Sequence, residues 1–321
     1  MSHRHGGHGA SDHKSHHRAH DGVRDGVRDG VHDGAHDGAH DGAHDGAHDG
    51  LADLLDLDAE VLAEQLHAVR ADIGSLADSP VRSILDLGAG TGTGTFGLLR
   101  HFAGAHALAV DSSEEMLERL RRRADDLGLQ DRVSTLRADL DDSIPEVAPV
   151  DLAWASASLH HLADPDRTLA ELVAAIRPGG LLAVVELAGF PRFVPDATPD
   201  GAAEARAHAL LAADRAMDMP AMGSDWGVRL TTAGLVVERD RPIVVDLAPP
   251  SAPLVGDYAA ASLMRIHGAV ADRLETRDRE ALDALLDGGT SDVRRRSDLH
   301  VTTERRLWIA RRPAASTPSR G

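Results

Sequence analysis

The chain has 321 residues, a formal net charge of -18 at pH 7 and no cysteine. Disulfides and thiolate chemistry are therefore excluded, and so acidic a surface would repel the phosphate backbone of a nucleic acid. No apolar run reaches the roughly 18 residues of a membrane-spanning helix, and no signal peptide is visible, so we expect a cytoplasmic protein without a membrane partner.

Residues 1–50 are of low complexity and consist largely of tetrapeptides such as His-Asp-Gly-Ala. A glycine at every fourth position opposes a helix, so we expect a disordered tail. A dedicated metal site needs fixed geometry, which such a tail does not provide, so we expect a solvated segment. The alternative is weak divalent-metal binding by histidines spaced four apart, namely His32, His36, His40, His44 and His48.

Residues 51–80 have leucines at helical spacing and predict an N-terminal helical lead. Short apolar runs and helical patterns then alternate as far as Leu187. The expected strands are Val81–Leu87, Ala107–Asp111, Arg132–Leu140, Val150–Ser156 and Leu181–Leu187. Helices are expected between them, one of them opened by a capping box at Ser112 and Glu115.

Residues 188–312 alternate less regularly and predict lid helices and the final strands, followed by a disordered end at 313–321. Strand material is visible within Gly234–Leu247 and again at Arg305–Ala310. The order predicts an α/β protein with a Rossmann-like, doubly wound, mostly parallel seven-stranded sheet, helices on both faces and a helical insertion.

The most informative motif joins the first strand to the first helix of this alternation. Asp86 ends the strand, and Gly88, Gly90 and Gly92 follow at alternate positions. Such a turn lets a ligand lie against bare peptide groups and the N-terminus of the next helix.

Acidic side chains also follow the next two strands. Asp111 stands 21 residues after Gly90, where a carboxylate can accept hydrogen bonds from ribose hydroxyls, and Asp139 could accept from an exocyclic amine. Since ligands bind at the carboxyl ends of parallel strands, these residues predict a site for an adenosine-containing ligand.

These motifs resemble the class I S-adenosylmethionine-dependent methyltransferase family, of the small-molecule type. The resemblance covers 81–187, which it marks as the S-adenosylmethionine-binding core. It rests on the run 85–92, the acids at 111 and 139, the stretch 151–162 that ends in Ser158-Leu159-His160-His161-Leu162, and Arg177-Pro178-Gly179-Gly180.

The resemblance implies a role for each matching position. The turn 88–92 would hold the methionyl part, with Asp86 near the amino group, while Asp111 would bind the ribose. Met116 would pack on the adenine, Asp139 would accept from its amine, and Ser156 would line the path to the methyl group. The implied cofactor-binding residues are Asp86, Gly88, Ala89, Gly90, Gly92, Asp111, Ser112, Met116, Asp139, Leu140 and Ser156.

Two other functions remain open from the sequence. A G-x-G-x-x-G pattern at 92–97 suggests an NAD(P)-binding oxidoreductase, but it begins after the strand has ended, so its later glycines fall inside the helix. A protein of this fold can also keep the cofactor cleft and lose catalysis.

Methyl transfer to a small organic acceptor by in-line displacement is the predicted reaction. His160 and His161 are the candidate general bases, because a neutral imidazole suits that task near pH 7; capping or packing roles are the alternative. Further candidates for the acceptor pocket are Tyr258, His267, Trp226 and the segment 217–222.

Overall fold

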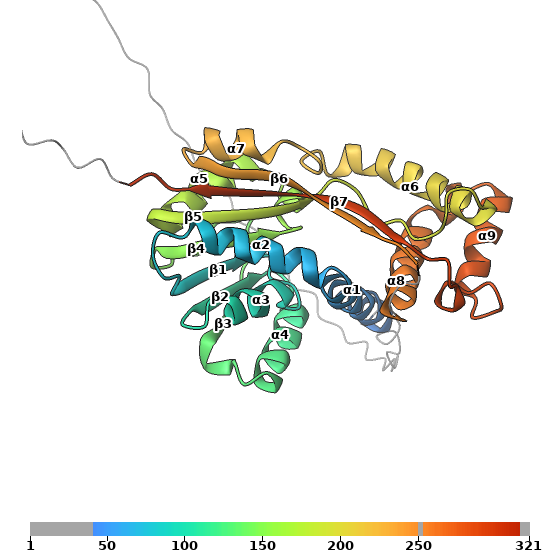
Figure 1. Cartoon of the computed structure of the whole chain (residues 1–321), viewed down its shortest axis with the longest axis horizontal. Helices are drawn as coiled ribbons and strands as arrows, with labels where there is room; N and C mark the ends of the chain where they lie inside the picture. The colour runs from blue at the N-terminus through green and yellow to red at the C-terminus, as the bar shows by residue number, and fades with distance from the viewer. Residues whose placement is uncertain (1–40, 250–252, 315–321) are drawn as a thin grey trace, which may run out of the picture.

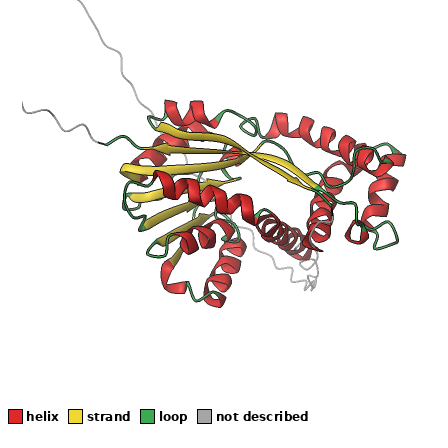
Figure 2. Cartoon of the chain, viewed as in Figure 1, coloured by secondary structure: helices red, strands yellow, loops and turns green. Residues whose placement is uncertain are grey.

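A computed structural model describes residues 41–249 and 253–314. One seven-stranded sheet has the order β3-β2-β1-β4-β5-β7-β6, as the sequence predicted for a doubly wound fold (Figures 1 and 2). The strand β7 runs antiparallel to both its neighbours, and the other pairs are parallel. The strands are β1 (Ser83–Leu87), β2 (His106–Asp111), β3 (Val133–Arg137), β4 (Val150–Ser156), β5 (Ile176–Leu187), β6 (Val236–Leu247) and β7 (Val301–Arg311).

Helices cover both faces of the sheet because its strands are apolar on both sides. On one face, α2 (Ala63–Leu76), α3 (Thr93–His101) and α4 (Glu114–Asp126) pack through side chains such as Val69 and Leu98. On the other, α5 (Pro165–Ala175) and α7 (Trp226–Thr232) pack through Leu169 and Leu230.

A helical lobe packs against the far ends of β6 and β7, at one end of the molecule in Figure 1. It contains α1 (Asp41–Val61), α6 (Pro199–Asp218), α8 (Pro253–Val270) and α9 (Thr276–Leu286). Its apolar cluster includes Phe193 and Tyr258, whose rings meet edge to face with centroids 5.1 Å apart. The lobe combines three helices of the segment 188–312 with α1 from the N-terminal side.

Three local features differ from the sequence predictions or add to them. The helix α1 begins at Asp41, so residues 41–50 of the predicted tail are helical, continuing the amphipathic helix that follows them; residues 1–40 lie outside the described part. The helix α4 is capped by Ser113, whose hydroxyl accepts from the Met116 N–H, rather than by Ser112. The strand β6 is continuous through Pro242, which an edge strand tolerates.

A buried ion pair joins the lobe to the sheet. Arg305 of β7 is 5% exposed and donates to the carboxylate of Asp58 on α1, and the Tyr258 hydroxyl of α8 donates to the same carboxylate at 2.5 Å. Burial lowers the pKa of Arg305, but the charge and hydrogen bond of Asp58, together with Tyr258 and Glu186, outweigh that effect and the pKa lies above its usual value. The pair therefore fixes α1 and α8 against β7.

Across the described residues, the helices include none that is long and apolar enough to cross a membrane.

We expect Asp58→Ala to lower the free energy of unfolding by about 3 kcal/mol, because it leaves a buried guanidinium without its carboxylate partner. Urea denaturation followed by circular dichroism measures the loss. Asp246→Ala, at an exposed position of β6, is the matched control and should change stability by no more than about 0.5 kcal/mol. Equal effects of the two substitutions would contradict the anchoring role.

Candidate functional site

The carboxyl ends of β1, β2 and β4 open into a cavity of about 540 Å³, within the range of small-molecule sites. The helix α1 closes one side of it with Leu51 and Leu55. Of the predicted cofactor-binding residues, Gly92 does not line the cavity. Those that do are Asp86, Gly88, Ala89, Gly90, Asp111, Ser112, Met116, Asp139, Leu140 and Ser156.

The glycine turn needs its glycines for two physical reasons. Gly88 and Gly90 have φ of 66° and 53°, a left-handed conformation that disfavours side chains. A Cβ on Gly88 would also lie 2.5 Å from the Cβ of Ser158. Gly92 is the left-handed N-cap of α3, and the space its side chain would fill is taken by Leu120 and Phe96.

The later glycines of the 92–97 pattern lie inside α3, as expected, and serve packing. A Cβ on Gly94 would meet the Trp154 indole nitrogen at 2.6 Å, and one on Gly97 would meet an Arg70 nitrogen at 2.8 Å. Close packing therefore accounts for both glycines without a pyrophosphate.

Asp111 connects the turn to the helix that follows β2. One carboxylate oxygen accepts from the Gly90 N–H at 2.8 Å, and the other accepts from the Ser113 N–H at 2.9 Å. Each carboxylate oxygen can accept a further bond, so the half-buried group can also receive ribose hydroxyls.

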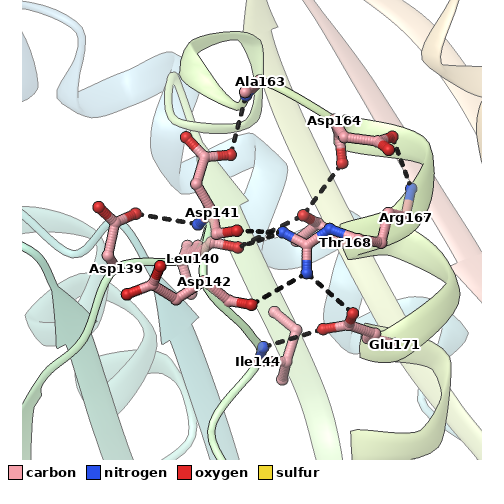
Figure 3. Close-up of polar contacts among 10 residues, drawn as sticks. All are labelled: Asp139, Leu140, Asp141, Asp142, Ile144, Ala163, Asp164, Arg167, Thr168 and Glu171. Carbon is pink, nitrogen blue, oxygen red and sulfur yellow. Dashed lines mark hydrogen bonds and ion pairs between the residues drawn. The ribbon is translucent and has the colours of Figure 1, made fainter. Parts of the chain in front are cut away.

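The loop after β3 is held from α5 (Figure 3). Asp139 is exposed, and its carboxylate accepts from the Asp141 N–H at 2.9 Å. The Arg167 guanidinium donates to the carbonyls of Asp141 at 2.5 Å and Asp142 at 3.1 Å, and to the Glu171 carboxylate at 2.9 Å. A fixed loop keeps Asp139 at the cavity wall.

Asp86 is buried at the end of β1, where the Thr95 hydroxyl donates to it at 2.5 Å. Burial raises its pKa to about 7; the Thr95 bonds oppose this rise, and the nearby Asp111 charge adds to it. The side chain can therefore change charge near neutral pH, and a cationic amino group beside it would favour the carboxylate.

The segment after β4 is strained and is held by Glu186 of β5. Ala157 has φ of 51°, the only positive value of a non-glycine residue in the described ranges. One oxygen of the buried Glu186 accepts from the N–H groups of Ser158 and Leu159 at 3.2 and 2.9 Å. Its other oxygen pairs with His160 Nδ1 at 2.5 Å, so three consecutive residues depend on one carboxylate.

The two histidines differ in position. His160 is buried against Glu186 and is not among the residues that line the cavity, which favours the alternative packing role over that of a general base. His161 lines the cavity, and its ring stacks on His160 with centroids 4.1 Å apart. Partial burial and the neighbouring His160 lower the pKa of His161, which keeps it neutral at pH 7.

Several cavity residues were missed from the sequence: Asp58, Arg70, Trp154 and Arg305. Arg70 is half-buried, and no carboxylate among the residues with described side chains pairs with it. Burial lowers its pKa, with a further contribution from Arg100. No sequence signal marks Arg70, since α2 reaches the cavity only by folding over the sheet.

The residues predicted to line an acceptor pocket lie at separate places in the fold. Tyr258 and Trp226 are buried in different apolar clusters, and His267 pairs with Asp283 at 3.0 Å. Met219, Pro220 and Met222 line a second cavity of about 480 Å³.

The predicted metal ligands His32, His36 and His40 lie outside the described residues, as do the side chains of His44 and His48. Elsewhere in 41–249 and 253–314, no group of three metal-ligating side chains is present.

A left-handed glycine turn after β1, with acids after β2 and β3, defines a Rossmann-like domain for an adenosine-containing ligand. Residues 84–180 match the family described as "Methyltransferase domain". The chain therefore carries a class I S-adenosylmethionine-dependent methyltransferase domain, which confirms the resemblance seen in the sequence.

Curated relatives share this part of the chain. A demethylmenaquinone methyltransferase of Clavibacter sepedonicus is 39% identical over 108 residues, which are 34% of this chain and 42% of the relative. A trans-aconitate 2-methyltransferase of Azoarcus sp. (strain BH72) is 35% identical over 121 residues, 38% of this chain and 45% of the relative. The chain thus spans less than half the length of these relatives.

Among solved structures, the YcgJ protein of Bacillus subtilis is 14% identical, with a TM-score of 0.48 over 78% of this chain and 99% of that one.

The raised pKa of Asp86 predicts a pH dependence of cofactor binding. Below pH 7, Asp86 is protonated in the protein without cofactor. The cationic amino group of S-adenosylmethionine needs the ionised carboxylate as its partner. The association constant for S-adenosylmethionine should therefore fall by about tenfold for each pH unit below 7 and level off above it. Isothermal titration calorimetry at several pH values measures this slope.

Asp86→Asn should bind more weakly at pH 8, with a much flatter profile between about pH 5.5 and 7. An equal slope in Asp86→Asn and the wild type would show that another group is responsible.

Proposed function

We propose that the whole protein transfers a methyl group from S-adenosylmethionine to a small organic acceptor, with residues 81–187 as the cofactor-binding core and 188–312 as the lid. The observation that carries the proposal is the convergence of the predicted turn and both acids on one cavity, together with the unpredicted Arg70. The names of the curated relatives, for demethylmenaquinone and trans-aconitate, support a small-molecule acceptor.

The residues of the cavity fit the cofactor group by group. The turn at Gly88 and Gly90 gives the methionyl chain a close approach to peptide groups, and Asp86 receives the amino group. The Arg70 guanidinium is suited to the carboxylate, because that ion pair would offset the cost of its burial. Asp111 receives the ribose hydroxyls, and the buried Met116 packs on the adenine.

When bound, S-adenosylmethionine supplies an electrophilic methyl group for in-line displacement. The protein has to align the acceptor and exclude water. Ser156 and Ala157 lie at the end of β4, on the path that an acceptor would take into the cavity, and Leu51 and Leu55 of α1 close the cavity.

His161 is the residue that can take a proton from the acceptor. Its ring is neutral at pH 7 and lines the cavity, so its free nitrogen can accept a proton from a hydroxyl or amine as attack begins. Glu186 positions it indirectly, by holding the Ser158 and Leu159 N–H groups and the adjacent His160.

Asp111→Ala should weaken binding of S-adenosylmethionine and of its demethylated product by about 100-fold, since two hydrogen bonds to a charged group are lost. Calorimetric titration of both ligands measures this. Asp131→Ala, an exposed acid remote from the cavity, is the control and should bind as the wild type does. If the wild-type protein binds NAD but neither S-adenosylmethionine nor its demethylated product, the proposed function is overturned.

A further inference from the structure

The second cavity begins where β5 ends. Ala188, Gly189 and Phe190 form its wall directly after Leu187, and α6 contributes His208 and Arg215. The strands β4 and β5 are neighbours, with Ser156 opposite Val185. Both cavities therefore lie at the carboxyl-terminal ends of neighbouring strands, the cofactor cavity after β4 and the second cavity after β5.

Arg215 is an unusual wall residue for so acidic a protein. Its guanidinium stacks on the Phe190 ring, and no carboxylate among the described side chains pairs with it. Burial lowers its pKa to about 10, and the nearby Arg265 of α8 contributes to that change. Arg215 is thus half-buried without a counter-ion from the described part of the chain, and the nearby Arg265 is exposed.

His208 adds a neutral polar group to the same wall. Burial lowers its pKa to about 4, with contributions from Arg192 and Arg215, and its Nε2 atom is buried with no hydrogen-bond partner among the described residues. The nearest carboxylate, Glu204, is 3.8 Å from that atom and accepts instead from the N–H groups of Phe193 and Val194. The arginine that Glu204 approaches is Arg192, at 3.9 Å, and not Arg215.

The charges of Arg215 and Arg265 also reach His161, where both lower its pKa after the larger effects of burial and of the neighbouring histidine and Glu186. His161 lines the cofactor cavity, so the arginine pair and the methyl-transfer position are within electrostatic range of one another.

We propose that the second cavity, through Arg215 and His208, binds the anionic group of the methyl acceptor, a carboxylate or a phosphate. The inference rests on the proposed function and names its substrate class. A guanidinium offers paired N–H donors that match two oxygens of either anion, and the unpartnered His208 nitrogen supplies a further polar contact. The anion replaces the missing counter-ion, while the remainder of the acceptor reaches Ser156 and His161.

The test uses the full chain saturated with S-adenosylhomocysteine at low ionic strength. Succinate and inorganic phosphate are titrated separately by calorimetry, with neutral succinamide as the uncharged analogue. We expect at least one of the two anions to bind, and the one that binds shows whether the acceptor carries a carboxylate or a phosphate. Succinamide should not bind. Arg215→Gln should weaken anion binding at least tenfold, whereas Arg277→Gln, an exposed arginine on α9, should leave it unchanged.

A second readout is the NMR titration of His161. Succinate or phosphate should raise its pKa in the wild type, because the anion offsets the two arginines; in Arg215→Gln the pKa should already be higher and respond little to either ligand. Arg265→Gln, at an exposed position that tolerates substitution, provides a second variant if Arg215→Gln loses its circular dichroism spectrum. It should show a smaller change in the same direction.

Anion binding that is equal in the wild type, Arg215→Gln and Arg265→Gln overturns the inference, as does the absence of binding by both anions. Binding of S-adenosylhomocysteine is recorded separately for every variant. If S-adenosylhomocysteine binds but neither anion does, the proposed function stands and the proposed anion site is contradicted. If S-adenosylhomocysteine does not bind but Arg215-dependent anion binding remains, the proposed function is contradicted and the anion site stands.

Discussion

The buried pair between Asp58 and Arg305 is the contact on which the rest of the site depends. Arg305 is inside the protein on β7 and needs a carboxylate, and α1 supplies it from 247 residues earlier in the chain. Both residues line the cofactor cavity, and Tyr258 ties α8 to the same carboxylate. Docking of α1, assembly of the helical lobe and closure of the cavity are therefore coupled through a single charge pair.

A second carboxylate organises the centre of the site. The left-handed Ala157 stores strain at the end of β4, and Glu186 on the neighbouring strand offsets it with bonds to Ser158, Leu159 and His160. Because Glu186 lies within a central strand, the segment that carries His161 is fixed by the sheet rather than by its own loop. Such support suits a group that has to hold a constant distance from a reacting atom.

Each of the two cavities contains a cationic side chain without a carboxylate partner in the described part of the chain, although the protein as a whole is strongly acidic. Arg70 lies on the cofactor side and Arg215 on the other, each partly buried and without a carboxylate partner among the described side chains. An uncompensated buried charge lowers stability, so its retention at both positions is explained if anionic ligands bind there. In our proposals, the cofactor carboxylate and the acceptor anion take these two positions.

The sequence by itself determined the alternation of strands and helices, the glycine turn and the acids at Asp111 and Asp139. Those features are local: periodicity and turn chemistry act over a few residues, and the carboxyl ends of parallel strands meet at one edge. Only the tertiary structure decided which histidine faces the cavity, because burial of His160 depends on Glu186, 26 residues away. It also decided the positions of Arg70 and Arg215, because the sequence of a helix does not indicate which distant surface the helix packs against.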